Sequence, residues 1–82
     1  MKIYVFTYHA AYKCEYLETA NKVFRTMKEA LKAFKEWKDD ELNYIIRDNW
    51  KITSNTPLHL EAFEDGDYCA NHTEGYINEY EI

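Results

Sequence analysis

Apolar and polar residues alternate near both ends of the chain in the way that β-strands require. In residues 2–9, apolar side chains fall on both faces of an extended segment. They are Ile3 and Val5 on one face and Tyr4, Phe6 and Tyr8 on the other. A strand that is apolar on both faces usually lies inside a sheet, so we predict an interior strand here.

The next stretch fits two local structures. Tyr12, Cys14 and Tyr16 share one face of a strand, which favours an antiparallel hairpin whose second strand lies within residues 13–24. The same tyrosines are spaced four apart, which also suits a short helix over residues 10–18. We expect the hairpin and leave the helix as the alternative.

A capping box predicts the start of a long helix. Thr26 and Glu29 have the spacing at which a threonine hydroxyl accepts from the Glu29 amide while the carboxylate reaches back. An apolar stripe at helical spacing follows. Its members are Met27, Ala30, Leu31, Phe34 and Trp37. This pattern predicts an amphipathic helix with one face toward the core.

The stripe is interrupted in its second half. Continuing the period places Lys38 and Glu41 where apolar residues are expected, although Leu42, Ile45 and Ile46 resume it. Asp39 or Asp40 is a suitable N-cap for a new helical segment. We therefore expect a kink, or two consecutive helices, ending near Asp48–Asn49.

The last third of the chain has the texture of short strands and turns. Predicted strands cover residues 50–53, 58–63, 68–70 and 76–82. Predicted turns cover residues 54–57, the Asp65–Gly66 pair and residues 71–75. This pattern is typical of a β-meander.

Together these elements predict a single small α+β domain over residues 1–82. The expected architecture is an antiparallel sheet, made of an N-terminal β-hairpin plus a C-terminal β-meander, with one long or kinked helix packed on one face. The 46% hydrophobic content and the scarcity of glycine (two) and proline (one) indicate a packed globule, because disordered chains lack the apolar residues for a core. The pattern does not determine the strand order.

The chain shows no signal peptide and no apolar run of the ~20 residues that a membrane helix needs. We therefore expect a cytoplasmic protein without membrane contact, and free thiols at Cys14 and Cys69. The richness in Lys, Asn, Ile, Tyr and Phe suggests a low-GC bacterium or a phage as the source.

Charge is distributed unevenly along the chain. The net charge is −5, and no lysine or arginine follows Lys51. Seven carboxylates lie in that last stretch: Glu61, Glu64, Asp65, Asp67, Glu74, Glu79 and Glu81. One interpretation is an outward acidic patch that faces a basic partner, with tyrosines as anchors. The other is that these charges serve solubility and protect strand edges.

From this distribution we predict a non-catalytic protein–protein interaction module, such as a phage or mobile-element accessory protein or inhibitor. Its partner would be a protein with a basic, nucleic-acid-binding surface, whereas direct nucleic-acid binding is not expected. The predicted partner-binding residues are Glu61, Glu64, Asp65, Asp67, Tyr68, Glu74, Tyr76, Glu79 and Tyr80. A homo-oligomerising structural protein is an alternative.

A Cys/His metal site is the remaining alternative. Cys69 and His72 have C-x-x-H spacing, and His59, with Asp67 or Cys14, would complete the four ligands of a structural zinc. A single ligand pair is a weak signature, and neither a metal nor another cofactor is predicted. No catalytic residue is predicted either, since acidic neighbours disfavour a Cys69 thiolate and phosphate-binding glycine loops are missing.

Overall fold

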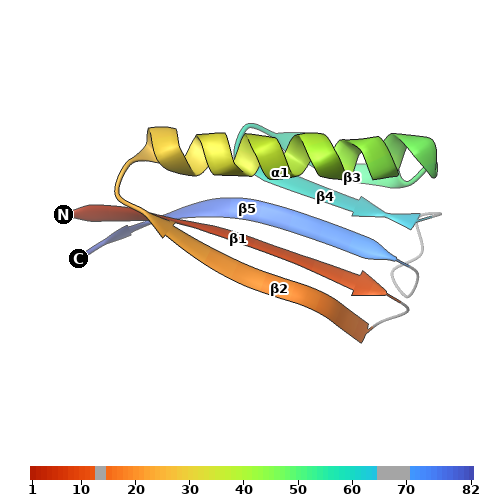
Figure 1. The fold of residues 1–82 in the computed structure, drawn as a ribbon, viewed down its shortest axis with the longest axis horizontal. Helices are drawn as coiled ribbons and strands as arrows, with labels where there is room; N and C mark the ends of the chain where they lie inside the picture. Colours follow the sequence, from red (N-terminus) through yellow and green to blue (C-terminus); the bar gives the residue numbers. More distant parts are fainter. Residues whose placement is uncertain (13–14, 65–70) are drawn as a thin grey trace.

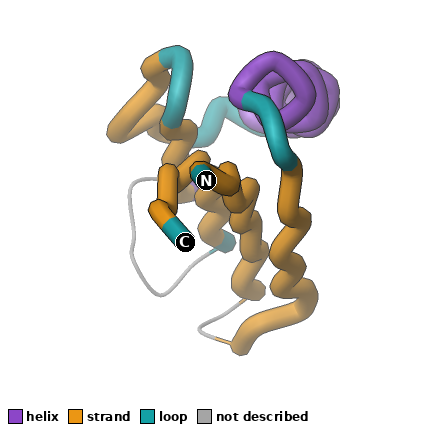
Figure 2. The backbone as a smooth tube through the Cα atoms, turned by 90° about the vertical axis from the view of Figure 1, so that its left-hand side faces the viewer, coloured by secondary structure: helices purple, strands orange, loops and turns teal. Residues whose placement is uncertain are grey.

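The computed structural model describes residues 1–12, 15–64 and 71–82. Along the chain it contains β1 (Lys2–Tyr12), β2 (Glu15–Phe24), α1 (Met27–Arg47), β3 (Lys51–Thr56), β4 (His59–Phe63) and β5 (His72–Glu81). The strands form one antiparallel sheet in the order β2-β1-β5-β4-β3 (Figure 1). Seen from the side, α1 lies on one face of this sheet (Figure 2). The predicted α+β architecture is confirmed.

The N-terminal hairpin forms as expected. β1 continues to Tyr12 and pairs with β2, for example Tyr4 opposite Phe24 and Tyr8 opposite Ala20. The alternative helix over residues 10–18 is therefore wrong. β1 lies between β2 and β5, in agreement with a strand that is apolar on both faces.

The capping box begins α1. The Thr26 hydroxyl oxygen accepts from the Glu29 backbone N–H at 3.2 Å and donates to the Glu29 carboxylate at 2.9 Å. The helix ends at Arg47 with Asp48 as its C-cap, followed by Asn49 with φ of 57°, a left-handed conformation that asparagine tolerates. Within the described residues, no helix combines the length and apolar content needed to cross a bilayer.

The expected division into two consecutive helices is not found, because α1 is one helix of 21 residues. The polar residues that interrupt the stripe have partners on neighbouring elements. The Lys38 amine donates to the Thr56 carbonyl at 3.1 Å, and the Glu41 carboxylate accepts from the buried Thr73 hydroxyl at 3.0 Å. Because these polar groups have hydrogen-bond partners, they can lie on the sheet-facing side of one continuous helix.

Two predicted turns in the last third are partly or wholly wrong. β3 extends to Thr56, so the turn expected over residues 54–57 is confined to its end. The turn expected over residues 71–75 does not form, because His72 begins the long strand β5 and Gly75 lies inside that strand. The expected strand over 68–70 and the Asp65–Gly66 turn lie outside the described residues.

The core lies between α1 and the sheet. Its buried apolar residues are Phe6, Ala30, Phe34, Ile45, Leu60, Ala62 and Ile77. Phe6 on β1 meets Phe34 edge-on at 5.7 Å between ring centroids and also contacts the Trp37 ring. Such aromatic pairs add stability beyond their buried area. Tyr4, Phe6 and Tyr8 of β1 therefore face the helix, and the residues between them, Val5 and Thr7, face away from it.

Candidate functional site

The sheet face turned away from α1 is called the helix-free face. Residues paired across neighbouring strands share a face, so the register assigns its members starting from the odd-numbered residues of β1. They include Val5, Thr7 and His9 on β1, Val23 on β2, His72, Glu74, Tyr76, Asn78 and Tyr80 on β5, and His59, Glu61 and Phe63 on β4. No described element covers this face (Figures 1 and 2).

All three histidines of the chain lie on the helix-free face. His9 pairs with Glu74, which pairs in turn with Glu61, so these residues form one row across β1, β5 and β4. His72 and His59 lie in the two adjoining rows, opposite Phe63 and Tyr76. We call His9, His59, His72, Glu61 and Glu74 the His/Glu cluster.

Glu74 is the centre of the first half of the cluster. Its Oε1 lies 3.3 Å from His9 Nε2, and its Oε2 lies 2.7 Å from His59 Nε2. An ionised carboxylate only accepts hydrogen bonds, so His59 donates from Nε2. His59 Nδ1 is hydrogen-bonded to the Ser54 hydroxyl at 2.6 Å. This chain of contacts connects Glu74 to β3.

Glu61 is the centre of the second half. Its Oε2 lies 3.2 Å from His72 Nε2, and its Oε1 accepts from the Thr53 hydroxyl at 2.9 Å. Burial raises the pKa of Glu61, but the hydrogen bonds from Thr53 and His72 and the charges of His72 and His59 outweigh it. The pKa therefore lies below its usual 4.5.

The arrangement places two carboxylates directly opposite each other, which is unfavourable for like charges on paired strands. Imidazole groups beside each carboxylate compensate for this repulsion. His72 also stacks on Phe63, with 4.3 Å between ring centroids. The cluster thus combines hydrogen-bonded nitrogen and oxygen atoms on strands whose backbones are fixed by pairing on both sides.

Three members of the cluster have the geometry of metal ligands. One ligand atom each from His9, His72 and Glu74 lies within 4.8 Å of the other two. Imidazole nitrogen and carboxylate oxygen are the donors that zinc and related divalent ions use in proteins.

The predicted partner-binding residues are divided by the structure. Glu61, Glu74, Tyr76 and Tyr80 share the helix-free face. Glu79 has the opposite orientation and forms an ion pair with Lys2 at 3.4 Å. Glu64, at the end of β4, accepts from the Asn71 side chain at 2.7 Å. Asp65, Asp67 and Tyr68 lie outside the described residues. The described carboxylates therefore do not form one continuous patch.

The alternative metal site is brought together only in part. His59 and His72 lie in the same cluster, whereas Cys69, Asp67 and Cys14 lie outside the described residues. Sequence reasoning missed His9 and the pairing of the histidines with Glu61 and Glu74. The signal available was the position of His59 and Glu61 on alternate residues of one predicted strand, but His72 and Glu74 fell in a predicted turn and the strand order was open.

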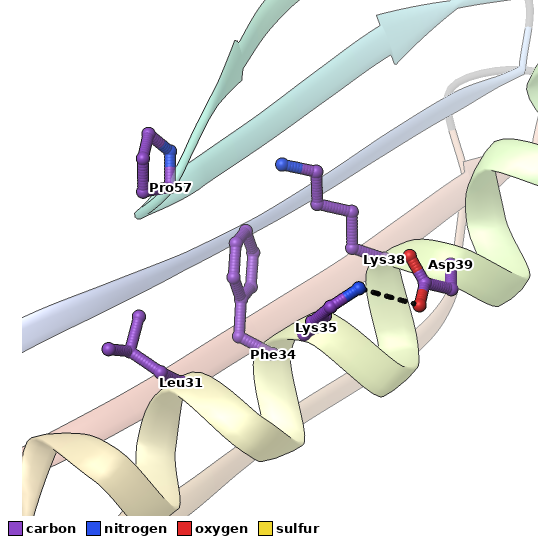
Figure 3. A pocket seen from close by; sticks show the side chains of 6 residues that line it. All are labelled: Leu31, Phe34, Lys35, Lys38, Asp39 and Pro57. Carbon is purple, nitrogen blue, oxygen red and sulfur yellow. Dashed lines mark hydrogen bonds and ion pairs between the residues drawn. The ribbon is translucent and has the colours of Figure 1, made fainter.

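A second feature is an apolar groove between α1 and the turn that joins β3 to β4 (Figure 3). Its volume is about 280 Å³, and it is lined by Leu31, Phe34, Lys35, Lys38, Asp39 and Pro57. Its charged groups are already paired, Lys35 with Asp39 at 3.3 Å and Lys38 with a backbone carbonyl. It offers fewer convergent polar groups than the His/Glu cluster.

Comparisons of the chain with protein-family models, with curated proteins and with solved structures find no match.

Proposed function

We propose that this chain is a non-catalytic interaction domain that binds a protein with a basic surface through its helix-free face. The observation that carries the proposal is the shared orientation of Glu61, Glu74, Tyr76 and Tyr80 on that face. Carboxylates beside tyrosines suit a groove of lysine and arginine, in which tyrosine rings act as anchors.

Exposed apolar groups on the same face support this proposal. The side chains of Val23 and Tyr80 are 63% and 50% exposed, which is high for residues of their type. Val23 lies on β2 and Tyr80 on β5, so the two flank the strand between them. A partner seated there would bury apolar area on both sides of β1.

The charge distribution supports a basic partner. Residues 52–82 contain no lysine or arginine, and Lys28, Lys32 and Lys35 lie on α1, in the other layer; Lys51, paired with Phe63, lies on the helix-free face at the edge strand β3. A basic surface would approach the β4–β5 half of the sheet with favourable steering, which raises association rates at low salt. By occupying such a surface, the domain would act as an inhibitor of the partner, in a phage or mobile-element setting.

The test uses capture from host extracts with three baits: the native chain, a Val23→Ala/Tyr80→Ala variant and a Lys28→Ala/Lys32→Ala variant. All four residues are exposed, so the variants should remain folded. We expect a partner that the native and lysine-variant baits retain and that binds the Val23/Tyr80 variant about tenfold more weakly or worse.

The charge component is tested on the purified complex. Affinity should fall between low and high salt, and Glu64→Lys should slow association, because both weaken electrostatic steering. A partner with an acidic contact surface, or equal binding by all three baits, would rule out the proposed function.

A further inference from the structure

We propose that His9, His72 and Glu74 form a binding site for a divalent transition-metal ion, with Zn²⁺ as its reference ligand. The proposal is independent of the interaction function, because the metal can be titrated into the isolated chain. It also differs from the Cys/His site that the C-x-x-H spacing suggests, since none of its ligands is a thiol.

The first argument is distance. Zinc bonds to nitrogen and oxygen of about 2.0–2.2 Å place the ligand atoms of a tetrahedral site about 3.3–3.6 Å apart. His9 Nε2 and Glu74 Oε1 are already 3.3 Å apart. All three ligand atoms lie within 4.8 Å of one another, so closure requires a shift of at most about 1.5 Å. Because the ligand atoms lie at the ends of rotatable side chains, we expect side-chain rotation to supply this shift without moving the strands.

The second argument is backbone rigidity. His9 and Glu74 face each other across β1 and β5, and His72 lies two residues before Glu74 on the same strand and face. Both strands are interior, each with a hydrogen-bonded neighbour on either side. The ligands are therefore held by the sheet itself, and little conformational entropy is lost when the ion binds.

The third argument is the outer layer of contacts around the three ligands. Glu61 lies 3.2 Å from His72 Nε2 and is itself held by Thr53, so it orients this ring for an ion that binds at Nδ1. His59 donates to the second oxygen of Glu74 and is held by Ser54. Carboxylates and hydrogen-bonded side chains of this kind orient metal ligands in known sites and raise their basicity.

The ligand set also indicates the coordination. Two imidazoles and one carboxylate leave at least one position of a tetrahedral ion for water or a fourth group. His9, His72 and Glu74 belong to the helix-free face, so that position is directed away from α1. Hard ions such as Mg²⁺ prefer all-oxygen sites and should bind this site weakly.

The test is calorimetric titration of ZnCl₂ into the reduced 82-residue chain. We expect one saturable site, with binding about tenfold weaker or worse in His9→Gln and in Glu74→Gln, since each loses a ligand. Glu79→Gln is the matched control, because it makes the same change on the same strand but on the opposite face. Its affinity should equal that of the native chain.

Two further measurements keep the result decisive if a variant misfolds. In the native chain, one equivalent of Zn²⁺ should shift the ring ¹⁵N resonances of His9 and His72. A Cys14→Ser/Cys69→Ser variant should retain the affinity. Absence of saturable binding, unchanged affinity in both ligand variants, ring shifts confined to His59, or loss of binding in the cysteine variant would each overturn the proposal.

Discussion

At the scale of single residues, Gly75 shows how a small side chain can serve packing inside a strand. The six-membered ring of Trp37 lies directly over it, and a Cβ at this position would come closer than 3.0 Å to ring atoms Cζ3 and Cη2. Trp37 in turn contacts Phe6, Tyr8 and Phe34. Glycine is needed here because the helix approaches β5 closely. It does not serve a turn, since Gly75 lies inside the strand.

We expect Gly75→Ala to lower the free energy of unfolding by about 1–3 kcal/mol, as other overpacked core positions do. The ring cannot yield cheaply, because three other aromatic side chains surround it. Urea denaturation followed by circular dichroism measures the effect. Asn78→Ala, at an exposed position of the same strand, should change stability by less than about 0.5 kcal/mol. Equal stability of the two variants would contradict this explanation.

At the scale of elements, the stability of α1 depends on the hydrogen bonds that cap its first turn. Thr26→Ala removes the acceptor of the Glu29 N–H and the donor to its carboxylate, and should destabilise the protein by about 1 kcal/mol. Thr26→Ser keeps both hydrogen bonds and should retain most of the stability. Thermal denaturation of the two variants distinguishes loss of the cap from a general effect of substitution at this position.

The elements also show what the sequence pattern can and cannot predict. Local signals sufficed for α1 and the first hairpin, because a capping box, a stripe at 3.6-residue spacing and strand alternation are properties of neighbouring residues. The predicted division into two helices at Lys38 and Glu41 failed because their partners, Thr56 and Thr73, lie on strands further along the chain. The predicted turn at 71–75 failed because Gly75 makes room for the Trp37 ring and does not form a turn.

Predicting the candidate site would likewise have required knowledge of contacts between residues far apart in the sequence. Glu61, Glu74, Tyr76 and Tyr80 were predicted as functional residues from charge and composition alone. Their grouping with His9 follows from the pairing of β1 with β5, which joins opposite ends of the chain. No local pattern specifies that register, so the His/Glu cluster becomes visible only in the folded sheet.

At the scale of the whole molecule, the cluster should make stability depend on acid pH. The pKa of Glu61 is lowered in the folded state, so its ionised form contributes stability that is complete above 4.5 and is lost as pH falls through the folded-state value. In buffer with a chelator, the native chain should therefore lose stability below about pH 4.5 more steeply than Glu61→Gln. Urea midpoints across this pH range measure it, and parallel curves would contradict it.

The position of β5 has a consequence for how the chain reaches this structure. Two hairpins, β1–β2 and β3–β4, close through local contacts, but neither pairs with the other; β5 lies between them and holds both. On the ribosome, β1 emerges with one of its two edges lacking a neighbour, because that neighbour, β5, is the last of the five strands to be synthesised. Until β5 is present, the two hairpins are not joined, and their unpaired strand edges can associate with other chains. Assembly of the five-stranded sheet therefore has to wait until β5 has been synthesised, and we expect it to include the insertion of β5 between β1 and β4.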